Sequence, residues 1–118
     1  MKKLTMDEFI AQGEELFGKN KKDWKWRCVS CGEVQSYHDF EKIGVKEIEG
    51  VVHFSCIGRY SEARGCNWTL GGLFTIHEKE ITGPNGDTHA VFNFEGEPYS
   101  NEREEAFKKK KTMAFEKV

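Results

Sequence analysis

Four cysteines offer the clearest chemistry in this sequence of 118 residues. Their spacing separates them into a tight Cys-x-x-Cys pair and a looser pair with nine residues between its members: Cys28 and Cys31, then Cys56 and Cys66. In an exported protein four cysteines would suggest two disulfides, whereas in a reducing compartment metal binding is the better interpretation. A structural zinc takes four ligands in a tetrahedron, and thiolates are among those it prefers. The sequence therefore predicts one structural Zn²⁺ held by all four cysteines.

Glycines beside the cysteines support this prediction. Gly32 follows the first pair and can adopt a positive φ, which lets the backbone turn back and brings N–H groups near the thiolates. Gly65 stands immediately before Cys66 and eases the approach of the second arm to the metal. A closed four-ligand site leaves no position for water or substrate, so the metal would be structural. Its binding free energy, on the order of 10 kcal/mol, would then contribute directly to folding.

Two alternatives to this ligand set remain open. His53 lies three residues before Cys56, and a site of Cys28, Cys31, His53 and Cys56 would leave Cys66 free. We favour Cys66 because four thiolates complete a closed site. A Cys-x-x-Cys pair also occurs in thioredoxin-like redox proteins, but the flanking sequence shows no βαβ pattern.

Local patterns predict the elements that must position these ligands. An amphipathic helix is predicted over residues 5–17, where Thr5 and Glu8 form a capping box. A short capped helix is predicted over residues 36–44 and a hairpin turn over residues 82–87. The remaining elements are strands around the tryptophans, around Cys56 and on either side of the turn, and then a C-terminal helix: residues 24–27, 51–57, 67–82, 89–94 and about 100–118.

Composition limits the class of protein. Apolar residues make up 37% and charged residues 32%, and nine Phe, three Trp and three Tyr indicate a packed core rather than disorder. No run approaches the roughly 18–20 apolar residues that span a bilayer. Asp7 and Glu8 interrupt the apolar stretch that a secretory signal would need, so we expect a cytoplasmic protein.

The same observations predict the fold and the domain organisation. With only two prolines and no linker or internal repeat, residues 1–118 are expected to form a single zinc-binding domain, with the helix at about 100–118 peripheral to it. The predicted class is α+β: a zinc-ribbon-like antiparallel sheet with an N-terminal and a C-terminal helix. A monomer or a homodimer is expected, and exposure of Phe107 or Phe115 on the last helix would favour the dimer.

Basic residues around the cysteines could form a patch beside the metal. Five precede the first pair and two lie in the second arm: Lys19, Lys21, Lys22, Lys25 and Arg27, then Arg59 and Arg64. Trp24 and Trp26 are interleaved with the first group, and aromatic side chains beside cations suit contacts with nucleic acid. We therefore predict a non-enzymatic binding module for nucleic acid, although the net charge of −2 opposes it. The predicted contacts are Lys21, Lys22, Lys25, Arg27, Arg59 and Arg64.

The cysteine blocks also carry a resemblance. The blocks are Trp24-Lys25-Trp26-Arg27-Cys28-Val29-Ser30-Cys31-Gly32, Cys56-Ile57-Gly58-Arg59, Gly65-Cys66-Asn67-Trp68 and Gly71-Gly72-Leu73. Together, over roughly residues 4–76, the sequence resembles small cysteine-rich, zinc-ribbon-like proteins of tailed phages and prophages, a biochemically uncharacterised family. The resemblance implies a phage or prophage origin and action in the cytoplasm of a host bacterial cell. It supplies no catalytic residues.

Two other functions stay open. The implied origin would suit an inhibitor that binds a host protein, such as a defence or transcription factor, through the acidic stretch from Glu95 to Glu105. A metal-dependent nuclease would need His, Asp or Glu side chains gathered in a cleft. The one candidate group lies around the predicted hairpin, and its spacing matches no nuclease motif: His77, Asp87, His89 and Asn93.

Overall fold

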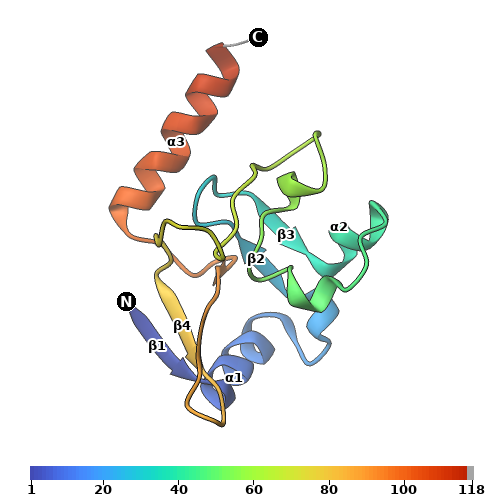
Figure 1. The fold of residues 1–118 in the computed structure, drawn as a ribbon, viewed down its shortest axis with the longest axis vertical. Coiled ribbons are helices and arrows are strands. Elements are labelled where there is room, and N and C mark those ends of the chain that lie inside the picture. Colours follow the sequence, from blue (N-terminus) through green and yellow to red (C-terminus); the bar gives the residue numbers. More distant parts are fainter. Residues whose placement is uncertain (117–118) are drawn as a thin grey trace.

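The structure, a computed structural model, describes the backbone of residues 1–116 and the side chains of residues 1–109. Three α-helices, α1 (Met6–Phe17), α2 (Tyr37–Lys42) and α3 (Asn101–Glu116), accompany two three-stranded sheets. In Figure 1, α1 lies beside strands β1 (Lys2–Thr5) and β4 (Lys79–Thr82), and α3 projects from the opposite end of the molecule. The predicted α+β class, with helices near both ends, is confirmed. In the described part of the chain no helix is both long and apolar enough to cross a membrane.

The first sheet joins the start of the chain to the predicted hairpin. Its strand order is β1 (Lys2–Thr5), β4 (Lys79–Thr82) and β5 (Thr88–Ala90). Strands β4 and β5 pair antiparallel across the turn at residues 83–87, which confirms the hairpin. Strand β1 instead pairs parallel to β4, with Lys2 opposite Lys79. The predicted single antiparallel sheet is thus replaced by two sheets, one of which is mixed.

The second sheet carries the first pair of cysteines. Strand β2 (Lys25–Arg27) lies in the centre, antiparallel to both β3 (Val34–Ser36) and β6 (Asn93–Phe94). The strand predicted over residues 89–94 is therefore divided between the two sheets. The division falls at Phe92, whose N–H donates to the His53 carbonyl at 2.9 Å instead of to a strand partner.

Both short-range helix predictions are confirmed. The Thr5 hydroxyl accepts from the Glu8 N–H at 3.2 Å and the Glu8 carboxylate accepts from the Thr5 N–H at 2.9 Å, which is the expected capping box. Helix α2 begins with an equivalent reciprocal pair between Ser36 and Asp39.

The apolar face of α1 packs on an aromatic cluster. The Phe9 ring stacks on Phe94 with 5.3 Å between ring centroids and contacts Trp26 at 5.6 Å. Gly13 lies over the Trp24 ring so closely that a Cβ at this position would come within 2.4 Å of it. Helix α1 therefore needs glycine there in order to approach β2.

The strands predicted over residues 51–57 and 67–78 are wrong. These residues form turns and irregular loops, apart from one isolated bridge between Ser55 and Thr69 and a 3-10 helix that begins at Ile57. The buried Gln35 amide supplies the hydrogen bonds that a neighbouring strand would have made. It donates at 2.8 Å to the carbonyls of Val52 and Ser55 and accepts from the Ile57 N–H at 2.8 Å. This loop delivers Cys56 to the end of β2 without a strand.

The first turns of α3 dock on the loop that contains the first two cysteines. Phe107 is 3% exposed and packs on Tyr99 at 5.7 Å between ring centroids. A Cβ on Gly32 would come within 2.9 Å of the Phe107 ring. Phe107 is therefore part of the core and gives no exposed surface that would favour a dimer, so the expectation of a monomer or a homodimer stays a prediction. The side chain of Phe115 lies outside the described residues.

Candidate metal centre

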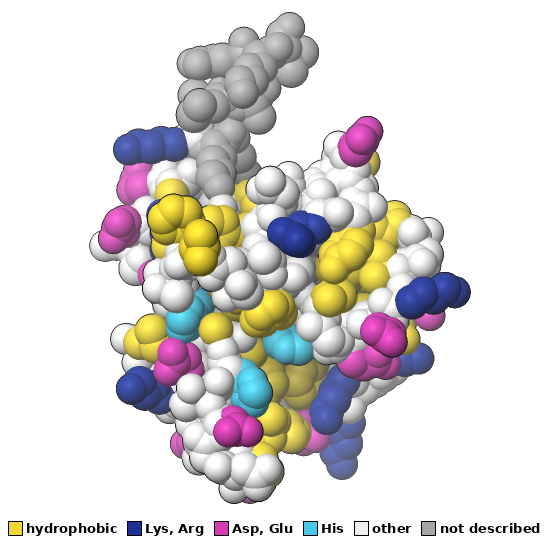
Figure 2. Space-filling view, in the orientation of Figure 1, with side chains coloured by type: hydrophobic (Ala, Val, Ile, Leu, Met, Phe, Trp, Pro, Cys, Tyr) yellow, Lys and Arg dark blue, Asp and Glu magenta, His cyan; other side chains and the backbone are white. Residues whose placement is uncertain are grey.

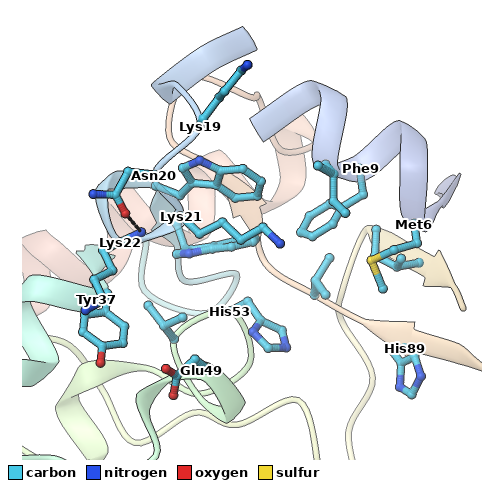
Figure 3. Close-up of a pocket in the computed structure, with 16 residues that line it drawn as sticks. Met6, Phe9, Lys19, Asn20, Lys21, Lys22, Tyr37, Glu49, His53 and His89 are labelled. Atoms are coloured by element: carbon cyan, nitrogen blue, oxygen red, sulfur yellow. Dashed lines mark hydrogen bonds between the residues drawn. The ribbon is translucent and has the colours of Figure 1, made fainter. Parts of the chain in front are cut away.

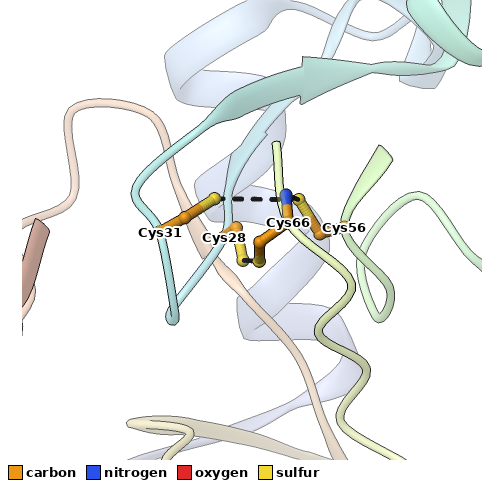
Figure 4. Close-up of side chains that lie close together, drawn as sticks. All are labelled: Cys28, Cys31, Cys56 and Cys66. Carbon is orange, nitrogen blue, oxygen red and sulfur yellow. Dashed lines mark hydrogen bonds between the residues drawn. The ribbon is translucent and has the colours of Figure 1, made fainter. Parts of the chain in front are cut away.

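The four cysteine side chains meet at one point. Their sulfur atoms all lie within 4.8 Å of one another, with 3.8 Å between Cys28 Sγ and Cys66 Sγ and 3.8 Å between Cys31 Sγ and Cys56 Sγ (Figure 4). None of the four forms a disulfide. A tetrahedral ion with metal–sulfur bonds of about 2.3 Å requires sulfur–sulfur distances of about 3.8 Å. The cluster therefore has the dimensions of a four-thiolate metal site.

The first arm of the site is a tight turn at the end of β2. The Gly32 N–H donates to the Cys28 carbonyl at 2.9 Å, and the φ of +81° at Gly32 turns the chain back toward β3. The Ser30 N–H points at Cys28 Sγ at 3.4 Å. Backbone N–H groups that face a sulfur favour its thiolate form, as a metal ligand requires.

Two glycines explain how the longer second arm brings its cysteines together. The Cys66 N–H donates to Cys56 Sγ at 3.2 Å, so the backbone returns directly over the first sulfur of this arm. A Cβ at Gly58 would lie 2.3 Å from the backbone N and O of Cys66, and one at Gly65 would lie 2.8 Å from Cys56 Sγ. Gly65 also has a φ of +77°. The nine residues between these cysteines thus form a closed loop, and its two ends pass close to each other at Gly58 and Gly65.

The thiols cannot all ionise in this space without a cation. Hydrogen bonding to the other three cysteines, together with burial, raises the pKa of Cys28 far above its ordinary value. Hydrogen bonds from Cys28 and Cys31 lower the pKa of Cys56 to about 7. Four thiolates this close repel one another, and a divalent cation removes that conflict. The residues therefore fit a bound metal ion such as zinc, and four protein ligands make a structural site rather than a catalytic one.

The alternative site, in which His53 replaces Cys66 as a ligand, is wrong. It is not part of the group of residues that could hold an ion, and its ring packs on Trp26 with 5.7 Å between centroids. Burial, with a smaller effect of His89, lowers its pKa. The candidate nuclease residues around the hairpin do not converge either. Among the described side chains, the four cysteines form the one group of three or more such residues close enough to share an ion.

The predicted nucleic-acid contacts fall into two classes. Arg27 forms a two-point ion pair with Glu104 at 2.6 and 3.0 Å, and its guanidinium lies 4.7 Å from the Phe107 ring centroid. Arg64 pairs with Glu33 at 3.1 Å and donates to the Val34 carbonyl. These two arginines hold α3 and the second arm in place. The other predicted contacts are exposed: Lys21, Lys22, Lys25 and Arg59.

One feature was missed by sequence reasoning: a cleft of about 660 Å³ beside the exposed lysines. It lies between α1, the turn before β2, the loop before Cys56, and strands β4 and β5 (Figure 3). Its lining includes both tryptophans of the Trp24–Trp26 segment, His53 and His89. The interleaving of tryptophan with lysine was the one signal that could have suggested it.

Two loops joined by a four-cysteine cluster, inside a mixed two-sheet fold, define a small α+β protein built around a candidate metal centre. The chain belongs to the VVA0879-like family, whose sequence pattern matches residues 5–95. The matched span includes all four cysteines and ends before α3 begins at Asn101. No curated protein and no solved structure matches the chain.

Proposed function

We propose that this chain is a non-enzymatic nucleic-acid-binding module whose fold is stabilised by a structural zinc. The observation that carries the proposal is the group of exposed lysines on the turn before β2, beside an aromatic cleft. An ion bound by the four cysteines would supply folding free energy and would fix β2, and with it this turn. It would take no part in chemistry, because all four positions are protein ligands.

The lysines suit contacts with phosphate because no carboxylate in the described part of the chain pairs with them. The four side chains, Lys19, Lys21, Lys22 and Lys25, are exposed, and none of them forms an ion pair with another described side chain. The one acid in the segment, Asp23, faces His38 at 3.1 Å. Lys22 lies 4.9 Å from the Tyr37 ring centroid, so a cation and an aromatic face are presented together. Proteins that bind single nucleic-acid strands commonly place cations, which contact the phosphates, beside aromatic rings, on which the bases stack.

The structure decides which of the predicted basic contacts a mutational test should change. Arg64→Ala would remove contacts that hold the second arm, so a loss of binding would report folding rather than recognition. Lys21→Gln with Lys22→Gln and Lys25→Gln removes exposed charge and the contact of Lys22 with the Tyr37 ring, and it breaks no ion pair among the described side chains. The matched control is Lys3→Gln with Lys42→Gln and Lys46→Gln, because these side chains are also exposed and line no part of the cleft.

The experiment measures fluorescence anisotropy of labelled DNA and RNA, single-stranded and duplex, with the zinc-loaded full chain. Three phosphate contacts to a single strand give a slope of about −2 in log K against log salt, so affinity should fall about 20-fold between about 50 and 200 mM salt. The triple variant should lose most of this slope, and the control should keep it. Absence of binding to every nucleic acid at the lower salt concentration would refute the proposal.

A second candidate is a host-protein inhibitor, and one observation favours it. Leu73 is 98% exposed and Phe74 is 73% exposed in the loop after Gly71 and Gly72. Adjacent large apolar side chains without cover are typical anchors for a protein partner. A phage or prophage origin and a host-cell cytoplasmic location belong to this proposal. The test is a pull-down from nuclease-treated bacterial lysate, in which a captured protein should be lost when Leu73 and Phe74 are both changed to Ser.

A further inference from the structure

The aromatic cleft beside the lysines has the features of a ligand site. Its volume of about 660 Å³ lies within the roughly 300–1,000 Å³ of ordinary small-molecule pockets. Figure 3 shows Lys21 and Lys22 at one end, Met6 and His89 at the other, and His53 between them. On the face in Figure 2, hydrophobic side chains and histidines lie together, with basic side chains along one border.

The residues that line the cleft have a net positive charge, whereas the whole chain has a net negative charge. Three lysines line it, Lys19, Lys21 and Lys22, against one carboxylate, Glu49, which gives a formal charge of +2. The chain as a whole has a net charge of −2. Local positive potential on an acidic protein selects for an anionic ligand and places its charge at the lysine end.

The interior of the cleft suits a flat, largely apolar ring. Its accessible aromatic surface comes from the half-buried rings of Phe9, Tyr37 and His53 and from the exposed ring of His89. Trp24 and Trp26 also line it, with only 2% and 5% of their surface exposed. Burial and the neighbouring His89 lower the pKa of His53, so this imidazole is neutral near pH 7 and can both stack and form a hydrogen bond. A ring with polar edges and a phosphate attached at one side matches these surroundings.

We infer that the cleft receives one unstacked base of a single-stranded nucleic acid, with the adjoining phosphates on Lys19, Lys21 and Lys22. This inference rests on the proposed nucleic-acid function and names its substrate class. A base inside a duplex is stacked on its neighbours and paired with the opposite strand, so it can enter the cleft only at the free-energy cost of unstacking and unpairing. The site therefore selects single strands over duplexes.

The test closes the cleft without disturbing the core. His89 is exposed on β5 and lines the cleft, so His89→Trp places a larger ring across its opening. Thr88→Trp is the matched control, because successive side chains on a strand point to opposite faces and Thr88 does not line the cleft. Both variants are loaded with zinc and compared with the unmodified full chain by thermal unfolding before binding is measured.

Base stacking predicts that His89→Trp weakens binding of a single-stranded oligonucleotide by about 5- to 150-fold, whereas Thr88→Trp binds as the unmodified chain does. Duplex of the same sequence should bind more weakly than the single strand. Adenosine monophosphate should quench the tryptophan fluorescence of the unmodified chain and compete with the oligonucleotide.

The outcomes separate the two proposals. Full single-strand binding by His89→Trp, or equal affinity for duplex, would overturn the cleft inference and leave the nucleic-acid function in place. Absence of binding to any strand at low salt would overturn both. If only the anionic dye anilinonaphthalene sulfonate binds, and His89→Trp blocks it, the cleft serves a small amphipathic anion and the inference is wrong.

Discussion

Removal of the metal ligands should unfold this protein rather than merely loosen it. The perturbation is Cys66→Ser, which takes one sulfur from the cluster while leaving a side chain of similar size. Cys66 Sγ lies 3.8 Å from Cys28 Sγ, and all four sulfur atoms lie within 4.8 Å of one another, so the change removes a ligand that joins the two arms. The same state can be reached in the unmodified chain with a strong zinc chelator.

The magnitude follows from the size of the chain. A protein of 118 residues has a free energy of unfolding of about 6–18 kcal/mol at the usual 0.05–0.15 kcal/mol per residue. A structural zinc bound by four cysteines contributes about 10–16 kcal/mol of apparent binding free energy at pH 7. The free energy of unfolding and the free energy of zinc binding are of comparable size, so the metal-free chain should be largely unfolded at room temperature.

The assay is circular dichroism with tryptophan fluorescence, because Trp24 and Trp26 are 2% and 5% exposed and should move into water on unfolding. Elemental analysis of the unmodified chain should give one zinc per chain. Asn67→Ser, at the exposed neighbour of Cys66, is the control and should bind zinc and fold normally. A chelated chain, verified as metal-free, that keeps its native spectrum and cooperative unfolding would refute this reasoning.

Two further predictions concern buried contacts away from the metal. Burial alone would raise the pKa of Glu97, but hydrogen bonds from Lys79 and Lys2 lower it from 4.5 to about 2. Since the folded pKa is the lower one, this stabilisation is present above about pH 4.5 and is lost as the pH falls toward 2. Glu97→Gln should lower the free energy of unfolding at pH 7, measured by urea titration, by about 3–5 kcal/mol, because it leaves the Lys79 charge buried without its partner. Glu95→Gln is the control and should change the free energy of unfolding very little, because Glu95 is exposed. Equal effects of the two substitutions would contradict this reasoning. Gly13→Ala should destabilise the fold by up to about 2 kcal/mol net, because overpacking against Trp24, typically about 1–3 kcal/mol, outweighs a gain of about 1 kcal/mol in helix propensity. A stabilised Gly13→Ala variant would show that helix propensity dominates at this position.

Sequence reasoning succeeded where the signal was local. The capping box at Thr5, the cap at Ser36 and the hairpin turn each depend on residues a few positions apart, and each forms as predicted. The meeting of the four cysteines was also predictable, because a thiolate ligand set restricts which residue types can join it.

The remaining features depend on partners distant in the sequence. Lys79 stands between Glu78 and Glu80 in a predicted strand, and no local pattern indicates its burial, yet it is fully buried and forms an ion pair with Glu97 at 2.9 Å. The sequence around Arg27 predicts a nucleic-acid contact there, but Glu104 on α3 pairs with it. The parallel pairing of β1 with β4 joins residues more than 70 positions apart, and no local pattern specifies it.

The order of the ligands along the chain has a consequence for synthesis on the ribosome. All four cysteines have been translated by residue 66, whereas β4, which recruits β1, begins at Lys79 and β6, which completes the other sheet, begins at Asn93. Chains emerge from the N-terminus at about 5–20 residues per second, so this leaves an interval of seconds or less between the two events. An ion can therefore capture its ligands while both sheets still lack their last strands, and the emerging strands then add to a nucleus that already has its shape.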